Sequence, residues 1–126
     1  MSEFKSIDFQ NDQLILIDQT VLPLEERYIK TDDYERIALS IERLEVRGAP
    51  AIGVTAAYAV ALAFKNTTND LDVNFGKVYE RLAETRPTAV NLFWALDKMK
   101  EVFNNNRDQE DIYKILLNAA KNIPIE

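Results

Sequence analysis

A run of fourteen residues without a charged side chain, AIGVTAAYAVALAF from Ala51 to Phe64, constrains this chain more than any other feature. A helix that is apolar on every side has to be buried on every side. Fourteen helical residues are too few to cross the hydrocarbon core of a bilayer. The run therefore predicts the central helix of a soluble core.

The segment that leads into this run, Arg47-Gly48-Ala49-Pro50, has the residue types of an anion-binding site. Pro50 suits the first position of a helix, and Gly48 permits a tight turn and a close backbone approach. The unpaired N–H groups and the positive dipole end at a helix start favour an anion. Arg47 adds a planar cation with five donors. In the alternative interpretation, Arg47 pairs with an acidic side chain and Gly48 only turns the chain.

A second segment, Arg86-Pro87-Thr88, repeats the pattern of an arginine before a proline that can open a helix. If the two helices pack side by side and parallel, Arg47 and Arg86 can face one anion. The alternative is two unrelated loop arginines in surface ion pairs, which contribute little to stability.

Composition excludes several classes of function. The 126 residues, 47% of them hydrophobic, are enough for one domain with a core. A net charge of −6 argues against a general nucleic-acid surface. The chain has no histidine and no cysteine, so an imidazole base, a thiolate nucleophile and a cysteine-based zinc site are excluded.

The remaining polar residues indicate neither a metal site nor a membrane protein. The acidic residues show no metal-site spacing and no catalytic pair, so we predict no metal and no catalytic residue within these 126 residues. The N-terminus, MSEFKSIDFQ, lacks the apolar stretch of a signal peptide, and we expect a cytoplasmic protein without a membrane partner.

The order of the predicted elements indicates an α+β fold, with a small N-terminal antiparallel sheet followed by a bundle of about five helices. Residues 1–30 form the predicted β subdomain, and residues 31–126 form the helical one. Alternating or β-favouring runs predict strands at 3–10, 14–17 and 27–30. Apolar spacing predicts helices over 31–46, 51–64, 71–84, 87–103 and 108–123. In the fourth helix we expect Val90 and Trp94 to extend the buried face.

Three segments in a fixed order resemble the methylthioribose-1-phosphate isomerase family. They are DQTVLP at 18–23, VRGAPAIG at 46–53 and RPTAVNL at 86–92. The resemblance extends over essentially the whole chain but only over the N-terminal part of the family. Family members have a larger, Rossmann-like C-terminal domain that carries the catalytic cysteine and aspartate, and that domain is absent here.

The resemblance implies an aldose–ketose isomerisation in methionine salvage, in which 5-methylthioribose 1-phosphate becomes 5-methylthioribulose 1-phosphate without a cofactor or metal. The family's substrate-binding Arg-Gly-Ala falls on Arg47, Gly48 and Ala49, and a second substrate-binding arginine falls on Arg86. Since the catalytic cysteine and aspartate have no counterpart, we expect the chain to be inactive alone and to require the missing domain as a partner. Homo-oligomer formation is left open.

Three other interpretations stay open. The chain could belong to a ribose-1,5-bisphosphate isomerase, or to an interaction module similar to the regulatory subunits of eukaryotic translation initiation factor 2B. It could also be a free-standing truncated relative that binds a protein partner. The intact segment RGAPAIG favours the methylthioribose branch, because we expect the arginine segments to be degraded in a regulatory subunit.

Overall fold

The computed structural model of the protein describes residues 7–21, 23–43, 45–46, 48–65, 67, 69–108 and 111–123. Several residues of the segments named above lie outside the described residues. They are residues 3–6 of the first predicted strand, Leu22, Leu44, Arg47 and residues 109–110 of the fifth predicted helix.

A three-stranded antiparallel sheet begins the described chain. Its strands are β1 (Ile7–Gln10), β2 (Gln13–Ile17) and β3 (Tyr28–Thr31), with β2 in the middle. Asn11 and Asp12 form the β1–β2 turn with φ of 54° and 61°, a conformation that these two residue types tolerate. The predicted small antiparallel sheet is confirmed. A short 3₁₀ turn at Gln19–Val21, which we did not predict, follows β2.

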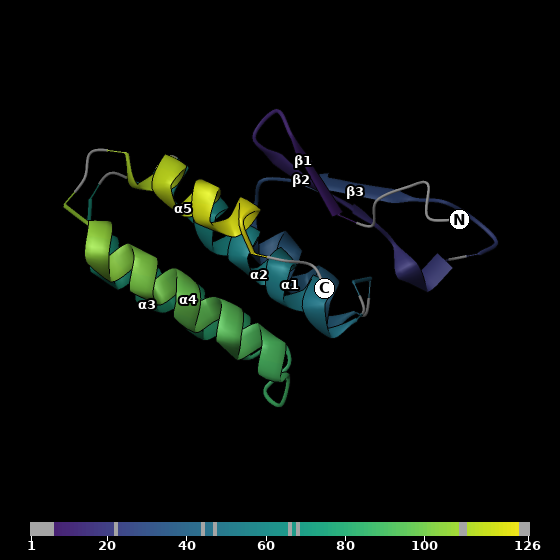
Figure 1. The fold of residues 1–126 in the computed structure, drawn as a ribbon. Helices are drawn as coiled ribbons and strands as arrows, with labels where there is room; N and C mark the ends of the chain where they lie inside the picture. The colour runs from purple at the N-terminus through teal and green to yellow at the C-terminus, as the bar shows by residue number, and fades with distance from the viewer. Residues whose placement is uncertain are drawn as a thin grey trace.

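Five helices complete the described chain, and the predicted α+β class is confirmed (Figure 1). They are α1 (Tyr34–Glu42), α2 (Ala49–Ala63), α3 (Leu71–Ala83), α4 (Val90–Asn106) and α5 (Ile112–Lys121). In Figure 1 the sheet lies to one side of the helices, with α4 in front of α3 and α5 in front of part of α2.

The helix α2 is the centre of the core, as its apolar sequence predicts. Its buried apolar side chains include Ile52, Val54, Ala56, Ala57, Ala59, Val60, Ala61 and Leu62. The sheet packs against it through Phe9, whose ring stacks on Tyr58 with centroids 5.3 Å apart. Lys121 of α5 covers the same Phe9 ring at 5.5 Å. The sheet is thus held by α2 and α5 together.

The helices α2 and α4 lie side by side and run in the same direction. Gly53, in the second turn of α2, lies against the backbone of Asn91 at the start of α4. Near the other ends, the rings of Phe64 and Phe103 have centroids 5.5 Å apart. Phe75, near the start of α3, packs on both of these rings, so α3 runs the opposite way. Both α2 and α4 therefore begin at the same end of the bundle.

Several boundary predictions are wrong. The first helix begins at Tyr34 instead of 31, and the fifth begins at Ile112 instead of 108. The first helix ends at Glu42 instead of 46, because the N–H groups of Glu45 and Val46 turn back to the carbonyl of Ser40. The fourth begins at Val90 instead of 87. It also continues to Asn106, beyond 103, and the Asn106 amide donates back to the carbonyl of Val102.

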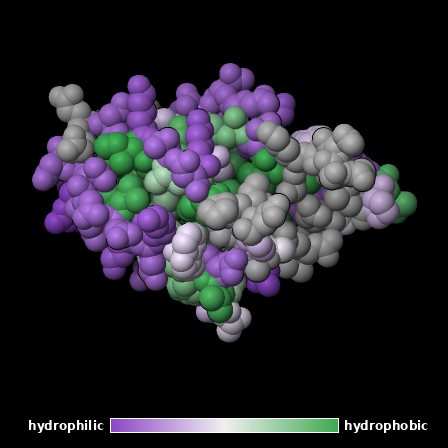
Figure 2. Space-filling model, viewed as in Figure 1, coloured by the Kyte–Doolittle hydropathy of each residue, from purple (hydrophilic) through white to green (hydrophobic). Residues whose placement is uncertain are grey.

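The prediction that Val90 and Trp94 extend the buried face of α4 is also wrong. They are 79% and 55% exposed, because the buried stripe of α4 runs through other positions. That stripe consists of Leu92, Ala95, Leu96, Met99 and Phe103. Figure 2 shows apolar surface near the N-terminal end of α4 on a face that is otherwise largely polar.

The contact at Gly53 generates a stability prediction. A Cβ at this position would lie 2.9 Å from the carbonyl oxygen of Asn91, closer than real Cβ atoms approach backbone. We expect Gly53→Ala to force α2 and α4 apart and to lower the free energy of unfolding by about 1–3 kcal/mol. The measurement is urea unfolding followed by circular dichroism.

Gly76 of α3 provides the matched control. A Cβ at Gly76 meets no atom within 4 Å, so Gly76→Ala should leave packing intact and raise the free energy of unfolding by up to about 1 kcal/mol. Equal effects of the two substitutions would contradict the close packing of α2 on α4.

Candidate functional site

The first candidate loop enters α2 through a glycine in a conformation that other residues rarely adopt. Gly48 is the N-cap of α2, with φ of 95° and ψ of 127°, and it has no side chain with which to cap the helix. Ala49 is the first helical residue, so Pro50 occupies the second position instead of the predicted first. Arg47 lies outside the described residues.

The second candidate loop is a turn rather than a direct helix start. The N–H of Ala89 donates to the carbonyl of Arg86 at 3.0 Å, which closes a four-residue turn with Pro87 at its second position. Pro87 therefore does not open α4, and the predicted equivalence with Pro50 is wrong. Arg86 is half-buried, and no described carboxylate forms an ion pair with it.

The parallel packing of α2 and α4 brings the starts of these two helices together. Neither N-cap, Gly48 or Ala89, supplies a side-chain acceptor. By contrast, the carboxylates of Asp33 and Asp111 accept backbone N–H groups at the starts of α1 and α5. Two adjacent helix starts without side-chain caps offer several N–H groups and two positive dipole ends to one anion.

A buried polar network adjoins the first loop, and sequence reasoning missed it. Arg36 of α1 donates to the hydroxyl of Ser40 at 2.8 Å and to the carboxylate of Glu45 at 2.9 Å. Ser40 and Glu45 are both buried. The sequence signal was weak, because Arg36 lies among alternating charges that are typical of a solvent-facing helix side.

Asp18, which directly follows β2, is influenced by the positive charge of Arg36. It is buried, and it accepts hydrogen bonds from the hydroxyl and the N–H of Thr20. Burial by itself would raise the pKa of Asp18. The hydrogen bonds from Thr20 and the positive charges of Arg27 and Arg36 outweigh burial and hold this pKa below its ordinary value of 3.8. The carboxylate of Asp18 is therefore ionised at neutral pH.

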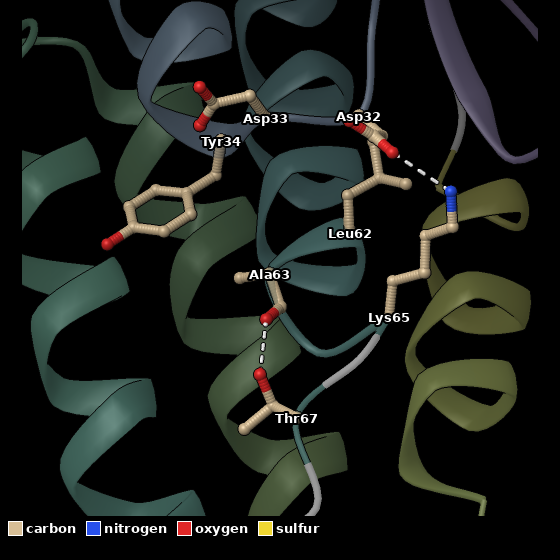
Figure 3. A pocket seen from close by; sticks show the side chains of 7 residues that line it. All are labelled: Asp32, Asp33, Tyr34, Leu62, Ala63, Lys65 and Thr67. Carbon is tan, nitrogen blue, oxygen red and sulfur yellow. Dashed lines mark hydrogen bonds and ion pairs between the residues drawn. The ribbon is translucent and has the colours of Figure 1, made fainter.

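A hollow of about 210 Å³ lies at the opposite end of α2 and has the features of a structural contact (Figure 3). Its lysine, Lys65, is already paired with Asp32 at 2.9 Å, and the hydroxyl of Thr67 donates to the carbonyl of Ala63. The hydrogen bond from Lys65 and its charge hold the pKa of Asp32 below 3.8, against the opposing effect of burial. The paired charges leave this hollow without a free cation for a phosphate.

In the described part of the chain, no three acidic side chains converge as metal ligands would. None of the helices described is both long enough and apolar enough to span a membrane.

Comparison with known proteins assigns the family. The family model described as the initiation factor 2 subunit family matches residues 45–125, which include both candidate loops. The chain belongs to this family.

Curated relatives carry a more particular name. Methylthioribose-1-phosphate isomerase from Caldicellulosiruptor saccharolyticus is 43% identical over 127 residues, covering 97% of this chain and 37% of the relative. The isomerase of the same name from Carboxydothermus hydrogenoformans is 47% identical over 119 residues, covering 91% and 35%. The chain thus spans little more than a third of the length of these relatives.

Two kinds of solved structure share the fold. The 5-methylthioribose 1-phosphate isomerase of Pyrococcus horikoshii matches with a TM-score of 0.88 and 33% identity, over 98% of this chain and 36% of that protein. The delta subunit of translation initiation factor eIF-2B from A. fulgidus matches with a TM-score of 0.87 and 34% identity, over 96% and 36%. The fold by itself therefore does not separate isomerase from initiation factor.

The conformation of Gly48 generates a second prediction. A Cβ at Gly48 would meet no atom within 4 Å, so any cost of Gly48→Ala comes from the backbone angle. We expect this substitution to lower the free energy of unfolding by about 1–3 kcal/mol. Urea unfolding measures it, and Gly76→Ala, a substitution in equally open space with ordinary helical angles, is the control. An unchanged free energy in Gly48→Ala would show that the loop does not require this conformation.

Proposed function

We propose that this chain is the substrate-binding N-terminal part of an aldose–ketose isomerase that converts 5-methylthioribose 1-phosphate to 5-methylthioribulose 1-phosphate in methionine salvage. The adjacent, uncapped starts of α2 and α4 support this proposal most directly. The name of the relatives, methylthioribose-1-phosphate isomerase, supports the choice of substrate. In this proposal, residues 1–30 and 31–126 are the β and helical parts of one N-terminal domain.

The proposed substrate-binding groups are Arg47, Gly48, Ala49 and Arg86. The backbone N–H groups after Gly48 and at the start of α4 would receive phosphate oxygens, and the two arginines would neutralise their charge. The arginines hold a permanent charge, so this binding persists across the pH range in which the phosphate is ionised.

The chemical step needs an acid and a base, and we assign neither role to a residue of this chain. Isomerisation moves a proton between C1 and C2, and the phosphate on C1 prevents free opening of the sugar ring. Such a step requires a positioned acid and base in a pocket that excludes water. The chain lacks histidine and cysteine, and we assign it binding and orientation while the remaining part of the enzyme supplies the acid and base.

The first functional prediction concerns the chain alone and in a complete enzyme. The purified 126-residue chain should show no formation of 5-methylthioribulose 1-phosphate. A chimera in which this chain replaces the matching 37% of the C. saccharolyticus isomerase should be active. Product formation is measured by chromatography. Turnover by the isolated chain would contradict the proposal that the rest of the enzyme supplies the acid and base. An inactive but folded chimera would contradict the proposal that this chain binds 5-methylthioribose 1-phosphate.

The second functional prediction concerns Arg86 in that chimera. Arg86→Gln removes one of two proposed phosphate cations, and we expect KM to rise at least about tenfold, since a charged hydrogen bond contributes about 1.5–3 kcal/mol. The control is Arg107→Gln, which removes an exposed ion pair with Asp72 at the far end of α4. An unchanged KM in Arg86→Gln, or equal changes in both variants, would remove Arg86 from the site.

A second candidate function is protein–protein interaction of the kind implied by the initiation factor match. The TM-score of 0.87 with the initiation factor subunit supports this function about as strongly as the TM-score of 0.88 supports the isomerase. This second function makes no use of the two arginines. A chimera that is folded but inactive would therefore favour protein–protein interaction over the isomerase.

A further inference from the structure

We propose that Arg36 is a positioning residue for Gly48 and the start of α2, because it ties Glu45, three residues before Gly48, to the side of α1. This inference rests on the proposed function in one respect only, which is that the start of α2 binds an anion. The positioning of Gly48 by Arg36 can be tested separately.

The side-chain contacts come first. One nitrogen of the Arg36 guanidinium, Nη1, donates both to Ser40 Oγ at 2.8 Å and to Glu45 Oε1 at 2.9 Å. The side chain of Glu45 is only 11% exposed, and that of Arg36 is 31% exposed. A buried carboxylate that loses its cation is strongly unfavourable, so Glu45 stays in place only while Arg36 faces it.

The backbone continues from this ion pair to the loop. The N–H groups of Glu45 and Val46 donate to the carbonyl of Ser40 at 2.9 and 3.3 Å. Two residues after Val46 the chain reaches Gly48, whose carbonyl accepts the N–H of Ile52 within α2. The two residues before Arg47 are thus fixed to α1, and the residue after it is fixed to α2.

The same helix carries a second arginine contact that does not reach the loop. Arg81 of α3 pairs with Glu35 and Glu42 of α1, each at 2.8 Å. These carboxylates are 53% and 35% exposed, and no described hydrogen bond from Arg81 reaches residues 43–48. Arg81 therefore anchors α1 to α3, whereas Arg36 anchors the loop to α1.

The experiment compares Arg36→Gln and Glu45→Gln with the control Arg81→Gln in the isotopically labelled 126-residue chain. Glu45→Gln removes the ion pair with Arg36 but keeps the positive charge of Arg36, so its effect on the loop is not an effect of Arg36 on Asp18. Hydrogen exchange is measured at the amides of residues 45 and 46. A titration with inorganic phosphate is followed by NMR at the Gly48 amide.

Arg36→Gln and Glu45→Gln should each increase hydrogen exchange at the amides of residues 45 and 46 at least about tenfold relative to the wild type, because local opening becomes easier. They should also weaken phosphate binding at Gly48 about tenfold. Arg81→Gln should change neither quantity. The charge-exchanged double variant Arg36→Glu with Glu45→Arg should recover most of both, and it keeps the test usable if Arg36→Gln fails to fold.

Unchanged exchange in Glu45→Gln and Arg36→Gln would overturn the inference, and so would an equal acceleration in Arg81→Gln. If exchange accelerates as expected but the wild-type Gly48 amide does not respond to phosphate, Arg36 positions the loop and the proposed anion site is wrong. The two failures are therefore distinguishable.

Discussion

The close contact between Gly53 and the backbone of Asn91 is the constraint on which the rest of the structure depends. Without a side chain at Gly53, α4 can approach α2 near the start of both helices. The aromatic contact of Phe64 with Phe103 fixes the opposite ends, so the pair is parallel. Parallel packing places two positive dipole ends at one end of the bundle, an arrangement that attracts an anion.

Much of the fold was predictable because the strongest sequence signals report burial. The charge-free run after Pro50 could only be a buried helix, and the Asn11–Asp12 turn between apolar strands indicated a hairpin. The ends of helices were less predictable. The end of α1 depends on a turn held by Ser40, and the start of α4 depends on the turn closed by Ala89. Local spacing does not contain such contacts.

The candidate site was predictable only in part, because local sequence shows residue types but not tertiary contacts. An arginine beside a glycine or proline at a helix start is visible in sequence, which is why Gly48 and Arg86 were predicted. The adjacency of the two helix starts depends on packing at Gly53, and the tie between Arg36 and Glu45 joins residues nine positions apart across a turn. Those contacts become evident only in three dimensions.

The chain spans about a third of the isomerases it resembles, and its fold is shared with an initiation factor subunit. The occurrence of one fold in both kinds of protein is consistent with a scaffold whose activity depends on its loops and on the domains joined to it. We propose one task for the two loops, which is to hold a phosphate between two helix starts.

The measurement that tests this account most directly is an NMR titration of the labelled chain with inorganic phosphate, followed at the amides of both helix starts. The account predicts that Gly48 and Ala49 of one start and Val90 and Asn91 of the other shift together, with a single dissociation constant. Shifts at one helix start alone, or two different constants, would contradict a shared anion site.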